Sequence, residues 1–75
     1  MKNEKLIRQF GLEVKRRRIE LGLTQEAFAD VSNLHRTYVS SIERGGRNPT
    51  LDIIFQIARG LQCQPASLLP EVDTL

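Results

Sequence analysis

The chain has 75 residues, of which 40% are hydrophobic and 27% charged, and its formal net charge is +2. This length fits one small domain, and the composition is that of an ordinary globular protein. One histidine and one cysteine exclude an internal disulfide framework and a cysteine-rich zinc site, and they leave little material for an enzyme. We expect a single domain over residues 1–75 with a folded core at about 5–69, no catalytic residues, no cofactor and no metal.

The charge is distributed unevenly along the chain. Residues 1–50 hold ten basic and six acidic residues, whereas residues 51–75 hold one basic and three acidic residues. A basic first part favours contact with a polyanion and an acidic, apolar last part favours contact with protein, although a merely solvated charged surface has the same composition. No apolar run approaches the roughly 20 residues that span a bilayer, and the first residues lack a signal-peptide core. We therefore expect a cytoplasmic protein without a membrane partner.

Helical periodicity begins near the N-terminus. The first predicted helix runs from about Lys5 to Leu21, and Gly22 follows its last turn as a helix-ending glycine. Its apolar stripe consists of Ile7, Phe10, Val14 and Leu21. The basic run Lys15, Arg16 and Arg17 is interpreted as a solvated face that adds long-range attraction to an anionic partner, without a specific contact.

Two short helices follow, joined by a tight turn. Thr24 is the predicted N-cap of a helix over Gln25–Ser32 that buries Phe28 and Ala29. Asn33 lies in the turn, where asparagine tolerates a left-handed backbone. The next helix, Arg36–Glu43, directs Val39 and Ile42 inward and stops at Gly45-Gly46. Two helices joined in this way are the pattern of a helix-turn-helix unit.

The last third of the chain predicts two more helices. A fourth helix runs from about Leu51 to Leu61, and a short helix at about 65–69 carries Leu68 and Leu69, with a frayed tail beyond it. The core face of the fourth helix is assigned to Leu51, Ile54, Ile57, Ala58 and Leu61. No segment alternates with period two, so the predicted fold is all-α, a compact bundle of about five short helices.

The sequence resembles a known family at several blocks. Leu21-Gly22-Leu23-Thr24-Gln25-Glu26, then Phe28-Ala29, then Val39-Ser40-Ser41-Ile42-Glu43-Arg44-Gly45 resemble the phage-repressor-like helix-turn-helix family, over about residues 8–69. The block from Asn33 to Asn48 looks more specifically like the controller proteins of restriction-modification systems. That resemblance implies a lambda-repressor-like fold and a sequence-specific transcriptional regulator that binds double-stranded DNA. His35 departs from the family pattern, which has Ser or Thr there, and histidine is a weaker cap.

The resemblance and the helical geometry together assign site residues. Base contacts are assigned to Arg36, Thr37, Tyr38 and Ser41, because Arg can bond guanine and Thr can meet a thymine methyl in the major groove. For Tyr38, structural packing with an exposed hydroxyl remains the alternative. Phosphate contacts are assigned to Gln25, Ser40, Arg44, Arg47 and Asn48. For Arg47, an ordinary loop charge is the alternative.

Two structural assignments complete the prediction. Arg18 lies within about 20° of Ile7 around the first helix, so its guanidinium needs a buried partner. Glu43 is the partner that the family implies, and the two are predicted to form a structural ion pair. Ile53 and Phe55 are predicted to form a homodimer interface, since the fourth helix has more apolar surface than one small chain can cover.

Other functions remain to be weighed against a regulator. An antitoxin or another protein-interaction subunit can be built on the same fold, and fold does not fix function. Such an antitoxin more often extends beyond the compact domain, and only residues 70–75 remain here. An enzyme is rejected because no nucleophile and base set can be assembled from one His and one Cys. The expected partners are therefore duplex DNA and a second copy of the chain, with no small-molecule ligand.

Overall fold

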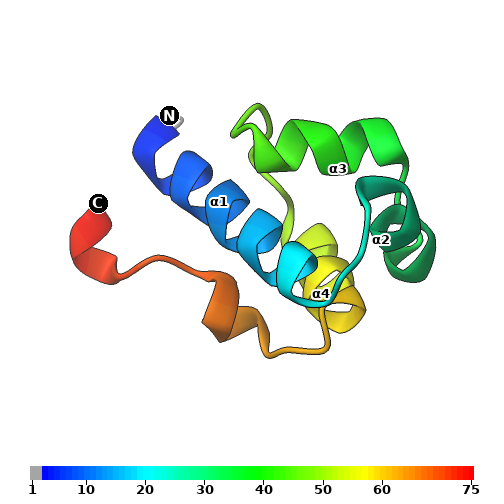
Figure 1. Cartoon of the computed structure of the whole chain (residues 1–75). Coiled ribbons are helices and arrows are strands. Elements are labelled where there is room, and N and C mark those ends of the chain that lie inside the picture. Colours follow the sequence, from blue (N-terminus) through cyan, green and yellow to red (C-terminus); the bar gives the residue numbers. More distant parts are fainter. Residues whose placement is uncertain (1–2) are drawn as a thin grey trace.

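The computed structural model describes residues 3–75 as four α-helices followed by two short 3-10 helices, and no strand occurs in that range (Figure 1). The elements are α1 (Glu4–Glu20), α2 (Gln25–Ser32), α3 (Arg36–Glu43), α4 (Leu51–Gly60), η1 (Pro65–Leu68) and η2 (Val72–Thr74). The predicted all-α fold with a helix-turn-helix is confirmed, and its fifth helix is the 3-10 turn η1. The C-terminal turn lies near the first turns of α1, at the opposite end from α2 (Figure 1).

Local capping explains where the helices begin and end. The Thr24 side chain accepts a hydrogen bond from the Ala27 amide at 3.0 Å, and Thr50 caps α4 in the same way. Asn33 ends α2 with a left-handed backbone at φ 57°, as its position in the turn predicts. His35 makes no side-chain cap to α3, in line with its weak capping chemistry. The bounds of α2 and α3 therefore match the sequence prediction.

The core lies where α1, α2, α3, α4 and η1 meet. Phe28 of α2 and Val14 of α1 are completely buried, and Leu68 brings η1 onto the same cluster. The buried cluster consists of Phe10, Val14, Phe28, Ala29, Val39, Ile42, Ile57, Ala58, Leu61 and Leu68. Gly11 allows α1 and α3 to approach closely, because a Cβ there would overlap the carbonyl oxygen of Ile42. Helix α3 is therefore held directly against α1.

Leu21 and Leu51, which were expected to pack inward, are exposed instead. Leu21 is 43% exposed because α1 ends one residue earlier, so that Leu21 only caps the helix. Leu51 is 69% exposed because it is the first residue of α4 and does not reach the core. Leu69 follows the last residue of η1 and is half exposed. The tail is not simply frayed: it forms η2, and the Thr74 hydroxyl lies 3.5 Å from Gln9 Oε1.

Candidate nucleic-acid interface

The turn between α2 and α3 is fixed from two directions. The Leu34 amide donates to the Ala29 carbonyl at 2.9 Å, which closes the end of α2. From α4, the Gln56 side chain donates to the Ser32 carbonyl at 3.2 Å and to the Asn33 carbonyl at 3.4 Å. These contacts satisfy carbonyls that a helix end leaves without partners. Helix α4 therefore helps to hold the turn between α2 and α3 in place. The sequence did not indicate this contact.

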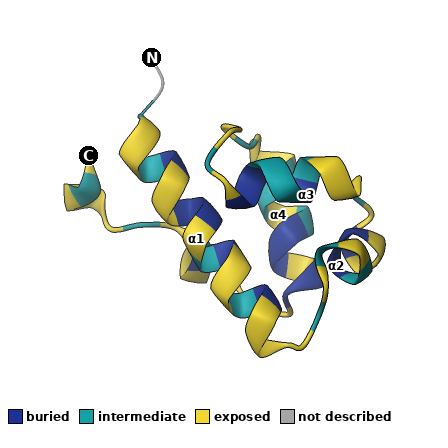
Figure 2. Ribbon diagram, turned by 45° about the horizontal axis from the view of Figure 1, so that its top comes forward, coloured by how far each residue is buried: buried dark blue, intermediate teal, exposed yellow. Residues whose placement is uncertain are grey.

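Helix α3 separates an apolar side from a polar, basic side. Arg36 and Thr37 are exposed at its first turn, whereas the residues after them are half-buried or buried, with Val39 and Ile42 in the core (Figure 2). Ser40 and Ser41 are half-buried beside this exposed side. Arg44, just beyond the helix, is exposed and donates to the Ser40 hydroxyl at 2.7 Å. Of the residues assigned to base contact, Arg36 and Thr37 are therefore exposed, whereas Tyr38 and Ser41 are half-buried.

The loop after α3 brings a second arginine next to Tyr38. The guanidinium carbon of Arg47 lies 5.1 Å from the centroid of the Tyr38 ring, which is the distance of a cation–π contact. Tyr38 is half-buried and packs against the core, whereas Arg47 and Asn48 are exposed. Tyr38 therefore packs against the core and is still partly accessible to solvent. The sequence analysis did not predict that an arginine would lie over its ring.

A buried ion pair lies behind this surface. Arg18 Nε donates to Glu43 Oε2 at 2.6 Å, and Arg18 Nη2 donates to Glu43 Oε1 at 3.0 Å. The third interaction of the guanidinium is a 2.7 Å hydrogen bond to the Leu23 carbonyl. Both side chains are at least nine-tenths buried, and no buried side-chain polar atom in the described part of the chain lacks a partner. The two residues that the sequence paired therefore meet with bidentate geometry.

Gln25 connects the ion pair to the surface. Its side-chain amide donates to Glu43 Oε1 at 3.1 Å, so that this oxygen accepts from both Arg18 and Gln25. Gln25 is the first residue of α2 and is half-buried. Its second amide hydrogen and its carbonyl oxygen stay available at the N-terminus of the helix, where anions are favoured.

Two of the three cations in the basic run of α1 are paired with carboxylates. Arg16 and Arg17 both form ion pairs with Glu13, and Arg16 also reaches Glu20 at 2.7 Å. The pKa of the Glu13 carboxyl lies below its usual value, chiefly because Arg16 donates a hydrogen bond to it. Lys15 is exposed and forms no ion pair within residues 3–75. Lys15 is therefore the one cation of this run without a carboxylate partner in the described residues, and the exposed Lys5 and Arg8 of α1 form no ion pair there either.

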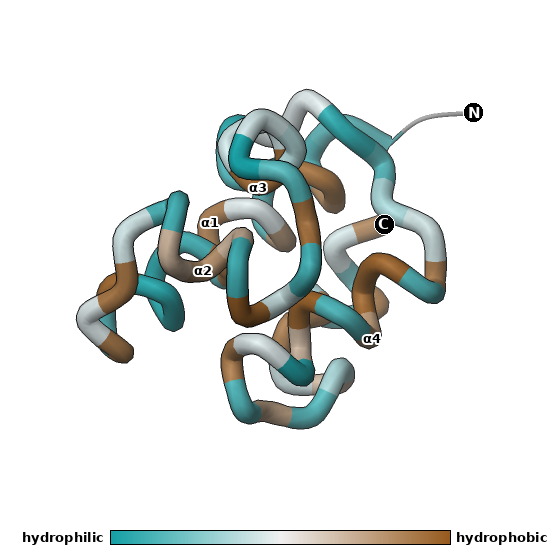
Figure 3. Tube along the Cα trace, turned by 90° about the vertical axis from the view of Figure 1, so that its right-hand side faces the viewer, coloured by the Kyte–Doolittle hydropathy of each residue, from teal (hydrophilic) through white to brown (hydrophobic). Residues whose placement is uncertain are grey.

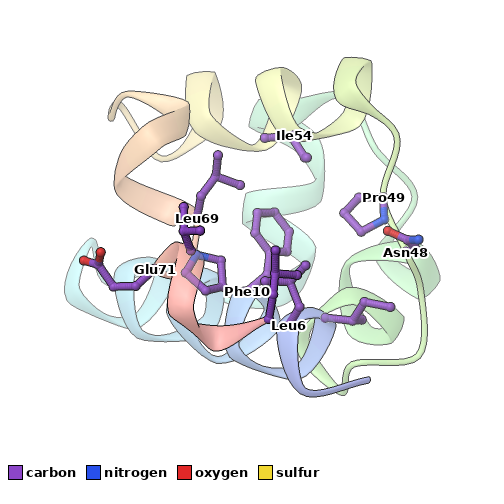
Figure 4. A pocket seen from close by; sticks show the side chains of 11 residues that line it. Leu6, Phe10, Asn48, Pro49, Ile54, Leu69 and Glu71 are labelled. Carbon is purple, nitrogen blue, oxygen red and sulfur yellow. The ribbon is translucent and has the colours of Figure 1, made fainter. Parts of the chain in front are cut away.

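Hydrophobic residues recur along α4 (Figure 3), and α4 and the tail carry exposed apolar side chains. Phe55 is 56% exposed and lies one turn from the exposed Leu51, whereas Ile53 is half-buried against the core. Beside them is a groove of about 260 Å³ between α1, the start of α4 and the tail. Phe10 and Leu6 of α1 face Ile54, Pro49 and Leu69 across it (Figure 4). This surface differs from the α3 side in the sign of its charge, since three of its four exposed charged residues are acidic: Asp52, Glu71 and Asp73, beside Arg59.

Two classes of site are not found in the described part of the chain. Within residues 3–75, no three His, Cys, Asp or Glu side chains gather where they could hold a metal ion. None of the helices in that range has the length and apolar character needed to cross a membrane.

The fold and the polar side of α3 define a helix-turn-helix protein, and comparison with known proteins agrees. Residues 14–68 match the family described as helix-turn-helix. The control protein C.BamHI of Bacillus amyloliquefaciens is 46% identical over 61 residues, which cover 80% of this chain and 75% of that relative. The chain therefore belongs to the helix-turn-helix family, and within it the chain is similar to control proteins.

Solved structures show the same similarity. The restriction-modification controller protein C.AhdI from Aeromonas hydrophila superposes with a TM-score of 0.82 and 38% identity, over 84% of this chain and 96% of that one. The controller protein C.Esp1396I is 40% identical, with a TM-score of 0.79 over 84% of this chain and 83% of that one. That protein was solved as a tetramer in complex with its natural 35-base-pair operator.

The buried ion pair leads to a stability prediction. Glu43→Ala leaves the Arg18 guanidinium buried without its carboxylate, which should lower the free energy of unfolding by about 3–5 kcal/mol. Thermal and urea unfolding followed by circular dichroism measure the change. Glu20→Ala is the matched control, since it breaks an exposed pair worth at most about 1 kcal/mol. Equal stability of the two variants would contradict the structural role of the pair.

Proposed function

We propose that the protein is a sequence-specific, double-stranded-DNA-binding transcriptional regulator that acts as a restriction-modification controller. The observation that carries the proposal is the accessible polar side of α3, presented by a braced helix-turn-helix. A helix of this kind enters the major groove with its first residues at the base edges. The similar protein C.Esp1396I, solved with its operator, supports the same use of the fold.

The residues take two roles in this proposal. Base edges are read by Arg36, Thr37, Tyr38 and Ser41, and the DNA backbone is held by Gln25, Ser40, Arg44, Arg47 and Asn48. Arg36 and Thr37 support the first role because they are exposed at the N-terminal turn of α3. Arg47 and Asn48 support the second role because they flank that helix on a loop. The protein in this proposal catalyses no reaction, needs no cofactor or small ligand, and works in the cytoplasm.

A homodimer through α4 completes the proposal. Phe55 is the first anchor, and its exposure supports that role. Ile53 remains the second anchor at the half-buried edge of the same surface, and the exposed Leu51 and Leu69 extend it. An exposed apolar patch of this kind is typical of a protein interface. Two-fold symmetry then places two α3 helices in successive major grooves, on a pseudo-palindromic operator with half-sites about 10 base pairs apart.

Binding to duplex DNA should be strongly salt-dependent. A dimer that neutralises roughly 6–10 phosphates gives a slope of about −5 to −9 for log affinity against log salt. Selection of bound duplexes from a random pool, followed by titration at several salt concentrations, measures both the operator and the slope. A flat salt response and no enriched sequence would favour the protein-interaction reading instead.

Two arginine substitutions should separate base reading from backbone holding. Arg36→Ala should weaken the selected operator by about 1–3 kcal/mol and relax the preference at one base pair. Arg47→Ala should weaken all duplexes about equally, because a phosphate contact carries no sequence information. Titration against the operator and its single-base variants compares the two. Loss of affinity with unchanged preference in Arg36→Ala would show that Arg36 does not touch a base.

Phe55→Asp tests the dimer. A charge placed in the apolar surface should convert the dimer into a folded monomer, since an unpaired charge is costly at a buried interface. Sedimentation velocity with circular dichroism measures the mass and the fold together. Asp52→Ala is the control, because it changes an exposed charge on the same helix. An intact dimer would remove Phe55 from the interface, and an unfolded chain would assign it to the core.

A further inference from the structure

The loop after α3 folds back along one side of that helix. The Gly45 amide donates to the Ile42 carbonyl at 3.0 Å, and the Gly46 amide donates to the Ser41 carbonyl at 2.8 Å. Gly46 lies so close that a Cβ there would be 3.0 Å from Ser41 Oγ. Ser41 and Tyr38 are three residues apart and hence on the same side of α3. The backbone therefore leads the loop from the end of α3 back toward Tyr38.

The guanidinium of Arg47 lies over the ring of Tyr38. Its guanidinium carbon is 5.1 Å from the ring centroid, and Arg47 has no ion-pair partner within residues 3–75. The ring is fixed because Tyr38 packs against the core, whereas Arg47 is exposed and long. The contact therefore restrains Arg47 rather than Tyr38.

A guanidinium stacked in this way keeps its hydrogen-bonding capacity. The guanidinium carbon lies over the ring, and the Arg47 side chain makes no hydrogen bond or ion pair within residues 3–75, so its five N–H donors remain free for an oxyanion. An arginine that is already restrained loses less conformational freedom when it binds. The stack thus prepares an anion-binding group beside α3 without occupying its donors.

We propose that Tyr38 is a positioning residue for Arg47, whose guanidinium it holds ready for a phosphate oxygen of the DNA backbone. This inference rests on the proposed function and deepens it. The face of the ring supports Arg47, while the hydroxyl is left for the base contact assigned above. Part of the contribution of Tyr38 to binding is therefore indirect and independent of DNA sequence.

A double-mutant cycle tests the coupling. Wild type, Tyr38→Leu, Arg47→Ala and the double variant are titrated by fluorescence anisotropy against a labelled mixed-sequence duplex of about 20 base pairs, two helical turns, at low salt. Tyr38→Leu should weaken binding about 2- to 5-fold when Arg47 is present and have no effect when it is absent. Tyr38→Phe, which keeps the ring, should keep the coupling: Arg47→Ala should weaken binding by the same factor in the Tyr38→Phe background as in wild type.

The controls distinguish the possible failures. Arg44→Ala is the matched control, because Arg44 is exposed and contacts Ser40, and its effect should simply multiply with that of Tyr38→Leu. Multiplicative effects of Tyr38→Leu and Arg47→Ala would overturn the inference and leave the proposed function standing. Failure of the wild-type protein to bind the duplex would overturn the proposed function and the inference with it.

A second measurement examines the stack without DNA and without changing Tyr38. The chain has one tyrosine and no tryptophan, so its intrinsic fluorescence comes from Tyr38. Arg47→Ala should increase quenching by acrylamide because it uncovers the ring face, while Arg44→Ala should quench like wild type. Both substitutions are on exposed residues, so the result stands even if Tyr38→Leu does not fold. Equal quenching of all three proteins would overturn the inference.

Discussion

The position of α3 depends on the buried pair of Arg18 and Glu43. A charge in the interior is costly unless it is paired and hydrogen-bonded, and here the carboxylate receives two bonds from Arg18 and one from Gln25. Arg18 also bonds the Leu23 carbonyl, so α1, the segment before α2, α2 itself and α3 meet at one pair of side chains. A helix held by such directional contacts presents its outer side in a single orientation. The orientation of the polar surface that meets DNA in the proposed function is therefore fixed by the buried side chains of Arg18 and Glu43.

The sequence predicted the helix-turn-helix closely because its limits are local. Thr24 and Asn33 determine the start and end of α2 by their own chemistry, so no knowledge of distant contacts is needed. The pairing of Arg18 with Glu43 followed from an arginine on an apolar stripe together with the family resemblance. Leu21 and Leu51 were misplaced because a helical projection treats a helix as endless, whereas residues at its ends extend past the neighbours that would cover them.

Contacts between distant polar side chains were beyond prediction. Gln56 was one polar residue on a helix, and nothing local shows that its amide reaches the carbonyls of Ser32 and Asn33. The stack of Arg47 on Tyr38 depends on how the glycine loop returns, which a helical projection does not describe. The sequence shows on which side of a helix a residue lies, but it does not show how far that residue is from residues of other helices.

The Gln56 contact has a consequence for the geometry of a dimer. Gln56 lies next to Phe55 on α4, so the helix with the apolar surface is also bonded to the turn before α3. In the proposed dimer through α4, the separation of the two α3 helices can therefore vary little. One additional base pair between half-sites rotates the second half-site by roughly 35° about the DNA axis, since a turn holds about 10–10.5 base pairs. In the proposed complex, a stiff link follows that rotation only if the DNA bends, so we expect the Gln56 contact to make binding sensitive to the spacing of the half-sites.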